Sequence, residues 1–217
     1  MALTLYTYWR SSASYRVRIA LNLKGVSAQH VAVNIAPAVS EQRGEAYRKI
    51  NPAMRVPALS IDGVTLIQSM AMLEWIEEAY PAPAVLPVDP LQRAACRAFA
   101  QTITSDIHPI QNMTVLNALR ANHGANDEGV RDWIHGVMVR GFDALEALAQ
   151  ARPDTQFMFG ETPTFAEICL VPQMFNARRF EVSLEPYRRL CEIDEAARSL
   201  PAFQDAAPEN QPDASVA

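Results

Sequence analysis

The chain has 217 residues, 49% of them hydrophobic and 20% charged, which is typical of a globular protein with one large core or two modest cores. No stretch approaches the roughly 18 consecutive apolar residues of a membrane-spanning helix, so a transmembrane protein is excluded. The formal net charge of −5 argues against broad binding to nucleic acid or to anionic membranes.

The chain opens with a predicted strand, a serine-rich turn and a helix. The apolar and aromatic run that starts at Leu3 has the length and the β-branched threonines of a strand. A polar turn follows at residues 11–14, and Val17 and Leu21 then recur at helical spacing. The first N–H groups of a helix have no intrahelical partner and favour negative charge, so we expect an anion to bind here.

The next elements complete a thioredoxin-like domain. Residues 29–35 alternate like a strand, and residues 40–50 have the weak periodicity of a short helix. Two apolar runs flank Asp62 and Gly63, which is a strong hairpin signal, and another helix follows. The order β-α-β-α-β-β-α over residues 1–80 predicts a mixed four-stranded sheet of the thioredoxin-like type. Thioredoxins carry Cys-x-x-Cys at the first strand–helix turn, whereas this turn contains no sulfur, which excludes dithiol redox chemistry there.

A proline-rich linker separates this domain from a helical one. Residues 81–90 contain four prolines and predict a stiff, extended connection. Beyond it, residues 91–217 predict an all-helical domain. Its first long helix should cover residues 91–122 and be kinked or split by Pro109, and a second amphipathic helix should cover residues 129–151.

The last third of the chain predicts the centre of the second core and a loose tail. Thr164 and Glu167 form a capping-box pattern before a helix that is apolar on nearly all sides, so this helix should be central. Further helical segments follow. A tail rich in proline, asparagine and aspartate begins at Pro208, and we expect it to be poorly ordered.

The cysteines and histidines indicate no metal site. The three cysteines, Cys96, Cys169 and Cys191, are odd in number and widely spaced, so we expect free thiols in a reducing compartment. No cysteine pair has metal-ligand spacing, and the four histidines form no ligand pattern. The N-terminus lacks the basic region and apolar core of a secretion signal. We therefore expect a cytoplasmic protein that binds no metal.

The whole chain resembles the cytosolic glutathione transferases, which combine a thioredoxin-like domain, a linker and an all-helical domain with a capped core helix. More narrowly, residues 11–21, Ser-Ser-Ala-Ser-Tyr-Arg-Val-Arg-Ile-Ala-Leu, resemble the zeta-class signature Ser-Ser-Cys-x-Trp-Arg-Val-Arg-Ile-Ala-Leu. Residues 51–59, 68–69 and 170–180 agree with that class too. The resemblance implies glutathione as a true cofactor, a small dicarboxylate substrate and a homodimer that binds neither nucleic acid nor membranes.

The resemblance places the glutathione sulfur at the serine-rich turn. An isolated thiol has a pKa of about 8.5, so a hydroxyl and helix N–H groups would be needed to stabilise its thiolate at neutral pH. Ser11 is the expected hydroxyl donor and Ser12 its neighbour at the helix start, and both are predicted to be catalytic. For each the alternative is a plain helix cap, a role that we expect Ser14 to fill. Arg16 and Arg18 are expected to be structural.

The rest of glutathione would be held by backbone and polar side chains of the same domain. The Val56 backbone, before a cis Pro57, would pair with the cysteinyl unit like an added strand. Gln68 and Ser69 would bind the γ-glutamyl carboxylate at a helix N-terminus, which Ser69 is predicted to cap. The alternatives are a plain cap for Ser69 and a solvated turn residue for Gln68. Gln42 would contact the glycyl end.

The helical domain contributes further predicted contacts. His108 and Asn112 are four residues apart, so they should face the same way, toward glutathione. Arg10 and Arg179 are the predicted partners of the substrate carboxylates, because a planar guanidinium binds a carboxylate through two hydrogen bonds. Arg10 is also predicted to be catalytic, since the arginines would stabilise the negative charge that develops on addition. The alternative for either arginine is a weak surface salt bridge. Arg178 is expected to be solvated.

The implied reaction is a cis–trans isomerisation, in which the thiolate adds to a cis double bond, the resulting single bond rotates and glutathione is eliminated. Residues 111–116 favour maleylacetoacetate, an acid of tyrosine and phenylalanine catabolism, because they lack the arginines that maleylpyruvate isomerases carry nearby. The linker, the Asp-Ile-His-Pro run at residues 106–109 and the Ala-Arg-Arg-Phe run at residues 177–180 instead favour maleylpyruvate. Ala13 replaces the signature cysteine, which puts full activity in doubt. A general glutathione transferase acting on α-halo acids and a non-catalytic binding module are the remaining alternatives.

Overall fold

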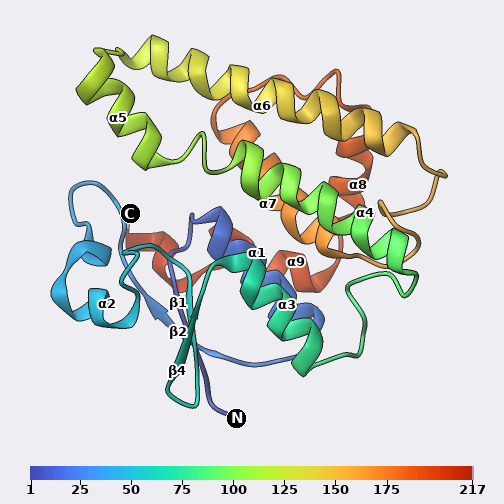
Figure 1. Ribbon diagram of the computed structural model, residues 1–217, viewed down its shortest axis with the longest axis horizontal. Helices are drawn as coiled ribbons and strands as arrows, with labels where there is room; N and C mark the ends of the chain where they lie inside the picture. Colours follow the sequence, from blue (N-terminus) through green and yellow to red (C-terminus); the bar gives the residue numbers. More distant parts are fainter. Residues whose placement is uncertain (217) are drawn as a thin grey trace. The chain divides into compact units, whose positions relative to one another are not determined.

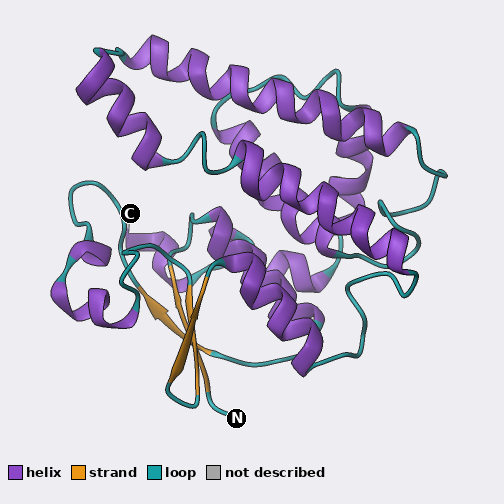
Figure 2. Ribbon diagram, in the orientation of Figure 1, coloured by secondary structure: helices purple, strands orange, loops and turns teal. Residues whose placement is uncertain are grey.

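The computed structural model describes residues 1–216, which form two compact units. The first unit joins residues 1–84 to the described residues from 199 onward, and the second covers residues 85–198 (Figure 1). Figure 2 shows that the strands belong to the first unit and that the second is helical. Among the described helices, none combines the length and the apolar character needed to cross a membrane.

The first unit is built on a mixed four-stranded sheet with the strand order β2-β1-β3-β4. β1 (Leu3–Thr7) pairs in parallel with β2 (Gln29–Ala32) and antiparallel with β3 (Ala58–Ile61), which pairs antiparallel with β4 (Val64–Ile67). The predicted βαβαββα order is therefore confirmed. The helices of this unit are α1 (Ser12–Leu23), α2 (Glu45–Ile50), α3 (Ser69–Ala79) and α9 (Pro201–Ala206), with the 3-10 helices η1 (Glu41–Arg43), η3 (Pro208–Asn210) and η4 (Pro212–Val216).

The predicted hairpin between β3 and β4 is present. Asp62 and Gly63 connect the two strands with φ angles of 47° and 90°. Two-residue turns of this kind match the twist of the flanking strands, and they need positive φ at both central positions. Glycine adopts that conformation freely, which is why Asp-Gly predicts the turn.

The alternation of side chains along β1 places helices on both faces of the sheet. The Thr7 hydroxyl accepts a hydrogen bond of 3.0 Å from Arg18 of α1. Tyr6 points to the other face, where its ring meets Tyr47 of α2 edge-on at 6.1 Å. Neighbouring strand residues face opposite ways, so α1 and α2 cover opposite faces. α3 packs beside α1, as Figure 1 shows.

The chain returns to the first unit at its C-terminal end. Tyr15, Arg18 and Asn22 lie on one face of α1 and donate to the carbonyls of Phe203, Ala206 and Ala202, at 3.5, 3.0 and 3.0 Å. The predicted assignment of residues 91–217 to one helical domain is therefore corrected for residues 199–216; residue 217 lies outside the described residues. The predicted loose tail is also wrong for residues 208–216. Prolines there begin short 3-10 helices, where a missing N–H costs nothing.

The second unit has the predicted central helix and the predicted break at Pro109. The Thr164 side chain accepts from the backbone at the start of α7, and the Glu167 carboxylate accepts from the Thr164 N–H at 2.7 Å, so the capping box is formed. The first predicted helix divides, because residues 108–112 are not helical. The elements of this unit are α4 (Pro90–Gln101), the π-helix η2 (Thr102–Ile107), α5 (Met113–His123), α6 (Asp127–Gln150), α7 (Phe165–Arg179) and α8 (Arg188–Arg198).

Candidate active site

Ser11 lies where β1 gives way to α1, and its side chain caps the helix. Its Oγ accepts a hydrogen bond of 3.3 Å from the Ser14 N–H. A hydroxyl has two acceptor sites and one hydrogen, so Ser11 can still donate to a ligand. Ser12 is the first residue of the helix and is buried. Ser14, the predicted cap, does not cap the helix; its Oγ is buried and has no partner among the described residues.

Arg10 precedes Ser11 and makes no ion pair with any described residue. Its guanidinium instead lies over the ring of Trp9, 5.2 Å from the centroid. The alternative of a surface salt bridge therefore does not apply to Arg10 in this structure. A stacked arginine keeps its N–H groups at the ring edge available for a carboxylate.

Arg16 joins the start of α3 to α1. Its side chain is only 2% exposed, and Nη1 donates to the Ser69 hydroxyl at 3.3 Å. Ser69 is the first residue of α3, so a cation and a helix N-terminus meet at one hydroxyl. Arg16 thus adds positive charge to a site that the sequence assigned only to Gln68 and Ser69. The one signal in the sequence is an arginine among apolar residues of α1.

The start of α3 differs from the prediction in its cap. Gln68, not Ser69, is the N-cap residue, and no side chain caps this helix. Gln68 has a φ of 71°, in the left-handed region that a residue with a Cβ seldom adopts. Strained backbone of this kind concentrates at ligand-binding positions. The exposed Gln68 side chain and the uncapped N–H groups of α3 are consistent with an anion site.

Val56 and Gln42 supply further parts of the predicted site. The Val56–Pro57 peptide is cis, as predicted. Val56 belongs to a buried cluster with Tyr8, against which Trp9 packs, so the segment before β3 lies close to the β1–α1 turn. The Gln42 Oε1 is buried and has no hydrogen-bond partner among the described residues. An unpartnered buried amide is costly, and a polar ligand would relieve that cost.

The predicted residues of the second unit lie in a turn and at two helix ends. His108 ends η2, with its N–H bonded to the Ile103 carbonyl at 2.8 Å, and Asn112 is the N-cap of α5, with its side chain accepting from Met113 at 2.7 Å. The predicted common direction of His108 and Asn112 rested on helical spacing, and residues 108–112 form no helix.

Arg179 is the last residue of α7, and its neighbour Arg178 is exposed, as expected of a solvated residue, but it is also part of an ion pair. The Arg179 guanidinium lies over the Phe180 ring, 4.7 Å from the centroid. Arg178 instead forms an ion pair with Asp194, whose side chain is fully buried and also pairs with Arg198 at 3.0 Å. A buried carboxylate needs such partners, which explains why Arg178 is committed within the second unit.

The chain offers no activated thiol of its own at the serine-rich turn. All three cysteines lie between residues 85 and 198, and none belongs to the first unit. Burial raises the pKa of Cys96 to about 11 and also raises the pKa of Cys191. A thiol must ionise to act as a nucleophile, so these two are inert at neutral pH. The donors at the start of α1 therefore fit a thiolate that a ligand supplies.

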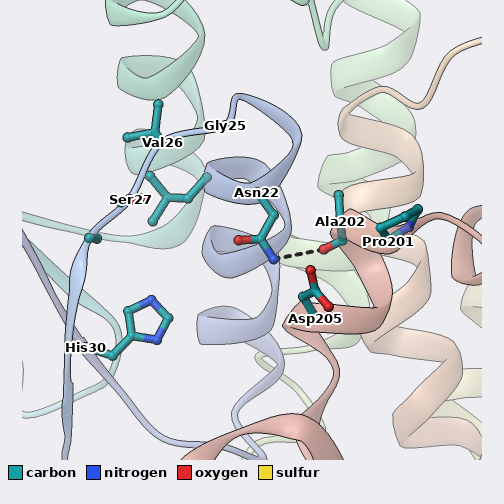
Figure 3. Close-up of a pocket in the computed structure, with 10 residues that line it drawn as sticks. Asn22, Gly25, Val26, Ser27, His30, Pro201, Ala202 and Asp205 are labelled. Atoms are coloured by element: carbon teal, nitrogen blue, oxygen red, sulfur yellow. Dashed lines mark hydrogen bonds between the residues drawn. The ribbon is translucent and has the colours of Figure 1, made fainter.

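A surface cavity of the first unit lies away from the predicted site residues. Figure 3 shows this cavity of about 610 Å³ between the end of α1, the following turn and α9. Asn22 donates to the Ala202 carbonyl at its edge, and His30 and Asp205 also line it. None of the predicted glutathione residues is among its lining. Within residues 1–216, no three His, Cys, Asp or Glu side chains are grouped to hold a metal ion.

Comparison with known proteins identifies the family. Residues 1–78 match the glutathione S-transferase N-terminal domain. A maleylacetoacetate isomerase of Pseudomonas aeruginosa is 46% identical over 98% of this chain and 99% of its own length. The holo structure of a maleylpyruvate isomerase, a bacterial zeta-class enzyme, is 45% identical with a TM-score of 0.94, covering 97% of this chain and 99% of that one. A maleylacetoacetate isomerase of Anaeromyxobacter dehalogenans with bound glutathione is 43% identical with a TM-score of 0.87, covering 98% of both chains. This chain therefore belongs to the zeta-class glutathione transferases, the family of the maleylacetoacetate and maleylpyruvate isomerases.

Proposed function

We propose that this protein is a glutathione-dependent cis–trans isomerase of maleylacetoacetate. The observation that carries the proposal is Ser11: its hydroxyl stands at the N-terminus of α1 with a hydrogen left to donate, in a chain that matches isomerases over nearly its whole length. Glutathione, when bound, supplies the thiolate that adds to the cis double bond and leaves after rotation. In this proposal the first unit, residues 1–84 with residues 199–216, binds glutathione, and the helical residues 85–198 bind substrate.

The residues of this chain hold and orient the reactants. Ser11 donates its hydroxyl to the sulfur, and the N–H groups at the start of α1, including that of Ser12, stabilise the negative charge. Gln68 and Ser69 bind the γ-glutamyl carboxylate, which the positive charge of Arg16 reinforces. Gln42 binds the glycyl end, and the Val56 backbone pairs with the cysteinyl unit. His108 and Asn112 are further proposed contacts to glutathione.

Arg10 and Arg179 are the proposed partners of the substrate carboxylates. Arg10 has no carboxylate partner among the described residues, which supports its assignment to a ligand. A guanidinium binds a carboxylate in two parallel hydrogen bonds and also stabilises negative charge that develops during reaction. No metal is needed for either role.

Maleylpyruvate is the second candidate substrate. The relatives of the two substrate types are nearly equally similar, at 46% and 45% identity. The absence of arginine from residues 111–116 favours maleylacetoacetate, because the shorter and more polar maleylpyruvate would need an extra cation there. Conjugation of glutathione to α-halo acids would use the same thiolate and is the alternative function.

The deciding experiment mixes the purified protein with each acid, with and without glutathione, and follows cis-to-trans conversion. We expect glutathione-dependent conversion with a higher kcat/KM for maleylacetoacetate. A higher kcat/KM for maleylpyruvate would identify maleylpyruvate, rather than maleylacetoacetate, as the substrate. Conjugation of an α-halo acid with no conversion of either acid would identify a transferase, and glutathione binding without any turnover would identify a binding module.

We also propose a cytoplasmic homodimer. The family resemblance supports the dimer, and sedimentation analysis of the full chain tests it. Three cysteines without disulfide bonds support a reducing compartment.

A further inference from the structure

The turn between β1 and α1 is held by two side chains from outside it. The turn covers residues 8–11 and carries Arg10 and Ser11. Its Tyr8 and Trp9 carbonyls accept hydrogen bonds from the Arg18 guanidinium at 3.4 and 2.9 Å. The Trp9 N–H donates to the Asp213 carboxylate at 2.9 Å, although Asp213 is 204 residues further along the chain. Inside the turn, the Ser11 N–H donates to the Tyr8 carbonyl at 3.0 Å.

Arg18 and Asp213 form one charged arrangement in the first unit. Arg18 is 1% exposed and also donates to Thr7 and to the Ala206 carbonyl, both at 3.0 Å. Burial lowers the pKa of Arg18 to about 10, and the Asp213 carboxylate opposes that change. The guanidinium therefore remains protonated at neutral pH, with Asp213 as the acid that compensates its charge. Arg18 binds the carbonyl side of the turn, and Asp213 binds the N–H side.

The position of this contact gives it a role beyond packing. Trp9 is one residue before Arg10 and two before Ser11, so the peptide that Asp213 holds sets the direction in which both side chains leave the turn. Removing the carboxylate would leave the Trp9 N–H without its acceptor, and the turn would relax. Errors of about 1 Å in the placement of a reacting group can reduce rates by about 100-fold.

We propose that Asp213 is a positioning residue of the glutathione site, which fixes the β1–α1 turn from the C-terminal end of the chain so that Ser11 meets the glutathione sulfur. The role of Ser11 in this statement rests on the proposed function. The holding of the turn itself does not, because it concerns the protein without ligand. The two parts can therefore be tested separately.

The first test measures hydrogen exchange of the Trp9 amide in the protein without ligand. Asp213→Ala removes the acceptor, and we expect exchange at Trp9 to become at least about tenfold faster. Asp213→Asn keeps an acceptor oxygen and should retain most of the protection. Glu209→Ala is the matched control, because Glu209 is an exposed acid of the same segment with no hydrogen bond to the turn. Unchanged exchange in Asp213→Ala overturns the proposal, whether or not the protein proves to be an isomerase.

The second test measures the dissociation constant of glutathione by calorimetry and the pKa of its bound thiol by the ultraviolet absorbance of the thiolate. Asp213→Ala should weaken binding about tenfold and raise the thiol pKa toward that of free glutathione, whereas Asp213→Asn and Glu209→Ala should stay close to the parent protein. A chain that ends at Gln211 provides a second variant if Asp213→Ala is unstable, since it keeps the Arg18–Ala206 contact. A folded variant with unchanged thiol pKa and affinity would reduce Asp213 to a structural contact.

Discussion

The Ser11 side-chain oxygen serves α1 as an acceptor and retains a hydrogen for a ligand. One group therefore has a structural task and a proposed catalytic one. A loss of activity in Ser11→Ala could not be assigned to the catalytic role alone, because losing the helix cap by itself costs about 1 kcal/mol of stability. Informative substitutions therefore remove the hydroxyl's hydrogen-bond donation to the ligand at little cost to the stability of α1.

Ser11→Gly isolates the hydroxyl, since glycine at an N-cap costs only a few tenths of a kcal/mol. We expect nearly unchanged stability, a raised pKa of the bound glutathione thiol and turnover lower by about 100-fold, as for the loss of one donor to a reacting anion. Ser11→Thr should recover most of the activity.

Asn126→Ala is the control for capping. Asn126 caps α6 in the second unit by accepting from Gly129 at 2.9 Å, so its loss should reduce stability without changing the thiol pKa. Parent-like thiol pKa and turnover in Ser11→Gly would remove Ser11 from the mechanism.

His30 reports on the charges around the β1–α1 turn. Burial and the Arg18 cation lower its pKa below the ordinary value of 6.5, while the Asp213 carboxylate opposes the change. Because folded His30 takes up a proton less readily than unfolded His30, stability should fall as the pH drops below about 6.5. Asp213→Asn should lower the pKa of His30 further. An NMR titration of the His30 ring protons in both proteins measures this. A raised pKa of His30 in Asp213→Asn would contradict the charge arrangement.

At the scale of elements, the sequence predicted correctly those features that depend only on residues close together in the chain. The Asp62-Gly63 hairpin, the Thr164–Glu167 capping box and the break at Pro109 each depend on a few neighbouring residues, and each is present. The cap of α3 was missed because Ser69 has the right residue type one position too late. The backbone there adopts a strained conformation at Gln68 that no propensity predicts.

The packing of α6 against the π-helix η2 depends on the glycine at position 141. A Cβ on Gly141 would lie 2.2 Å from Cδ1 of Ile107, a fully buried residue. Gly141→Ala should therefore destabilise the protein by about 1–3 kcal/mol through overpacking, measured by urea unfolding.

Gly136→Ala is the matched control in the same helix. Its Cβ would lie 3.5 Å from the flexible end of Arg140, so the better helix propensity of alanine should raise stability by up to about 1 kcal/mol. Equal stabilities of the two variants would show that η2 can move away from α6 at no cost.

At the scale of the whole molecule, the proline-rich linker and the helical patterns beyond it predicted two units but not their membership. The linker at residues 81–90 contains the point where the units divide, after residue 84. The return of residues 199–216 to the first unit could not be read from the sequence, because it depends on contacts between residues about 190 positions apart, such as Arg18 and Ala206. Arg18 was correctly predicted to be structural, whereas Arg16, also predicted to be structural, contacts Ser69 at the proposed anion site. The acceptors of both arginines could not be named from the sequence.

The first unit should be incomplete without its C-terminal segment. A fragment of residues 1–84 lacks the buried Phe203 and the carbonyls that bind Tyr15, Arg18 and Asn22. We expect this fragment to melt at a clearly lower temperature, by circular dichroism, than a fusion in which a flexible linker joins it to residues 199–217. Phe203→Ala in the fusion should remove about 3–5 kcal/mol of the recovered stability. Equal melting of fragment and fusion would contradict the requirement for α9.

The return of the chain to its first unit also sets the order in which the protein can mature on the ribosome. The strands and α1 leave the ribosome first, but α9 and Asp213 leave it last, after residues 85–198 have been synthesised. At ordinary elongation speeds this delay is on the order of ten seconds, long enough for a helical unit to fold in between. Nascent chains therefore carry an uncovered face of α1 throughout that interval, and a premature stop codon near the end of the gene would leave that face uncovered for good.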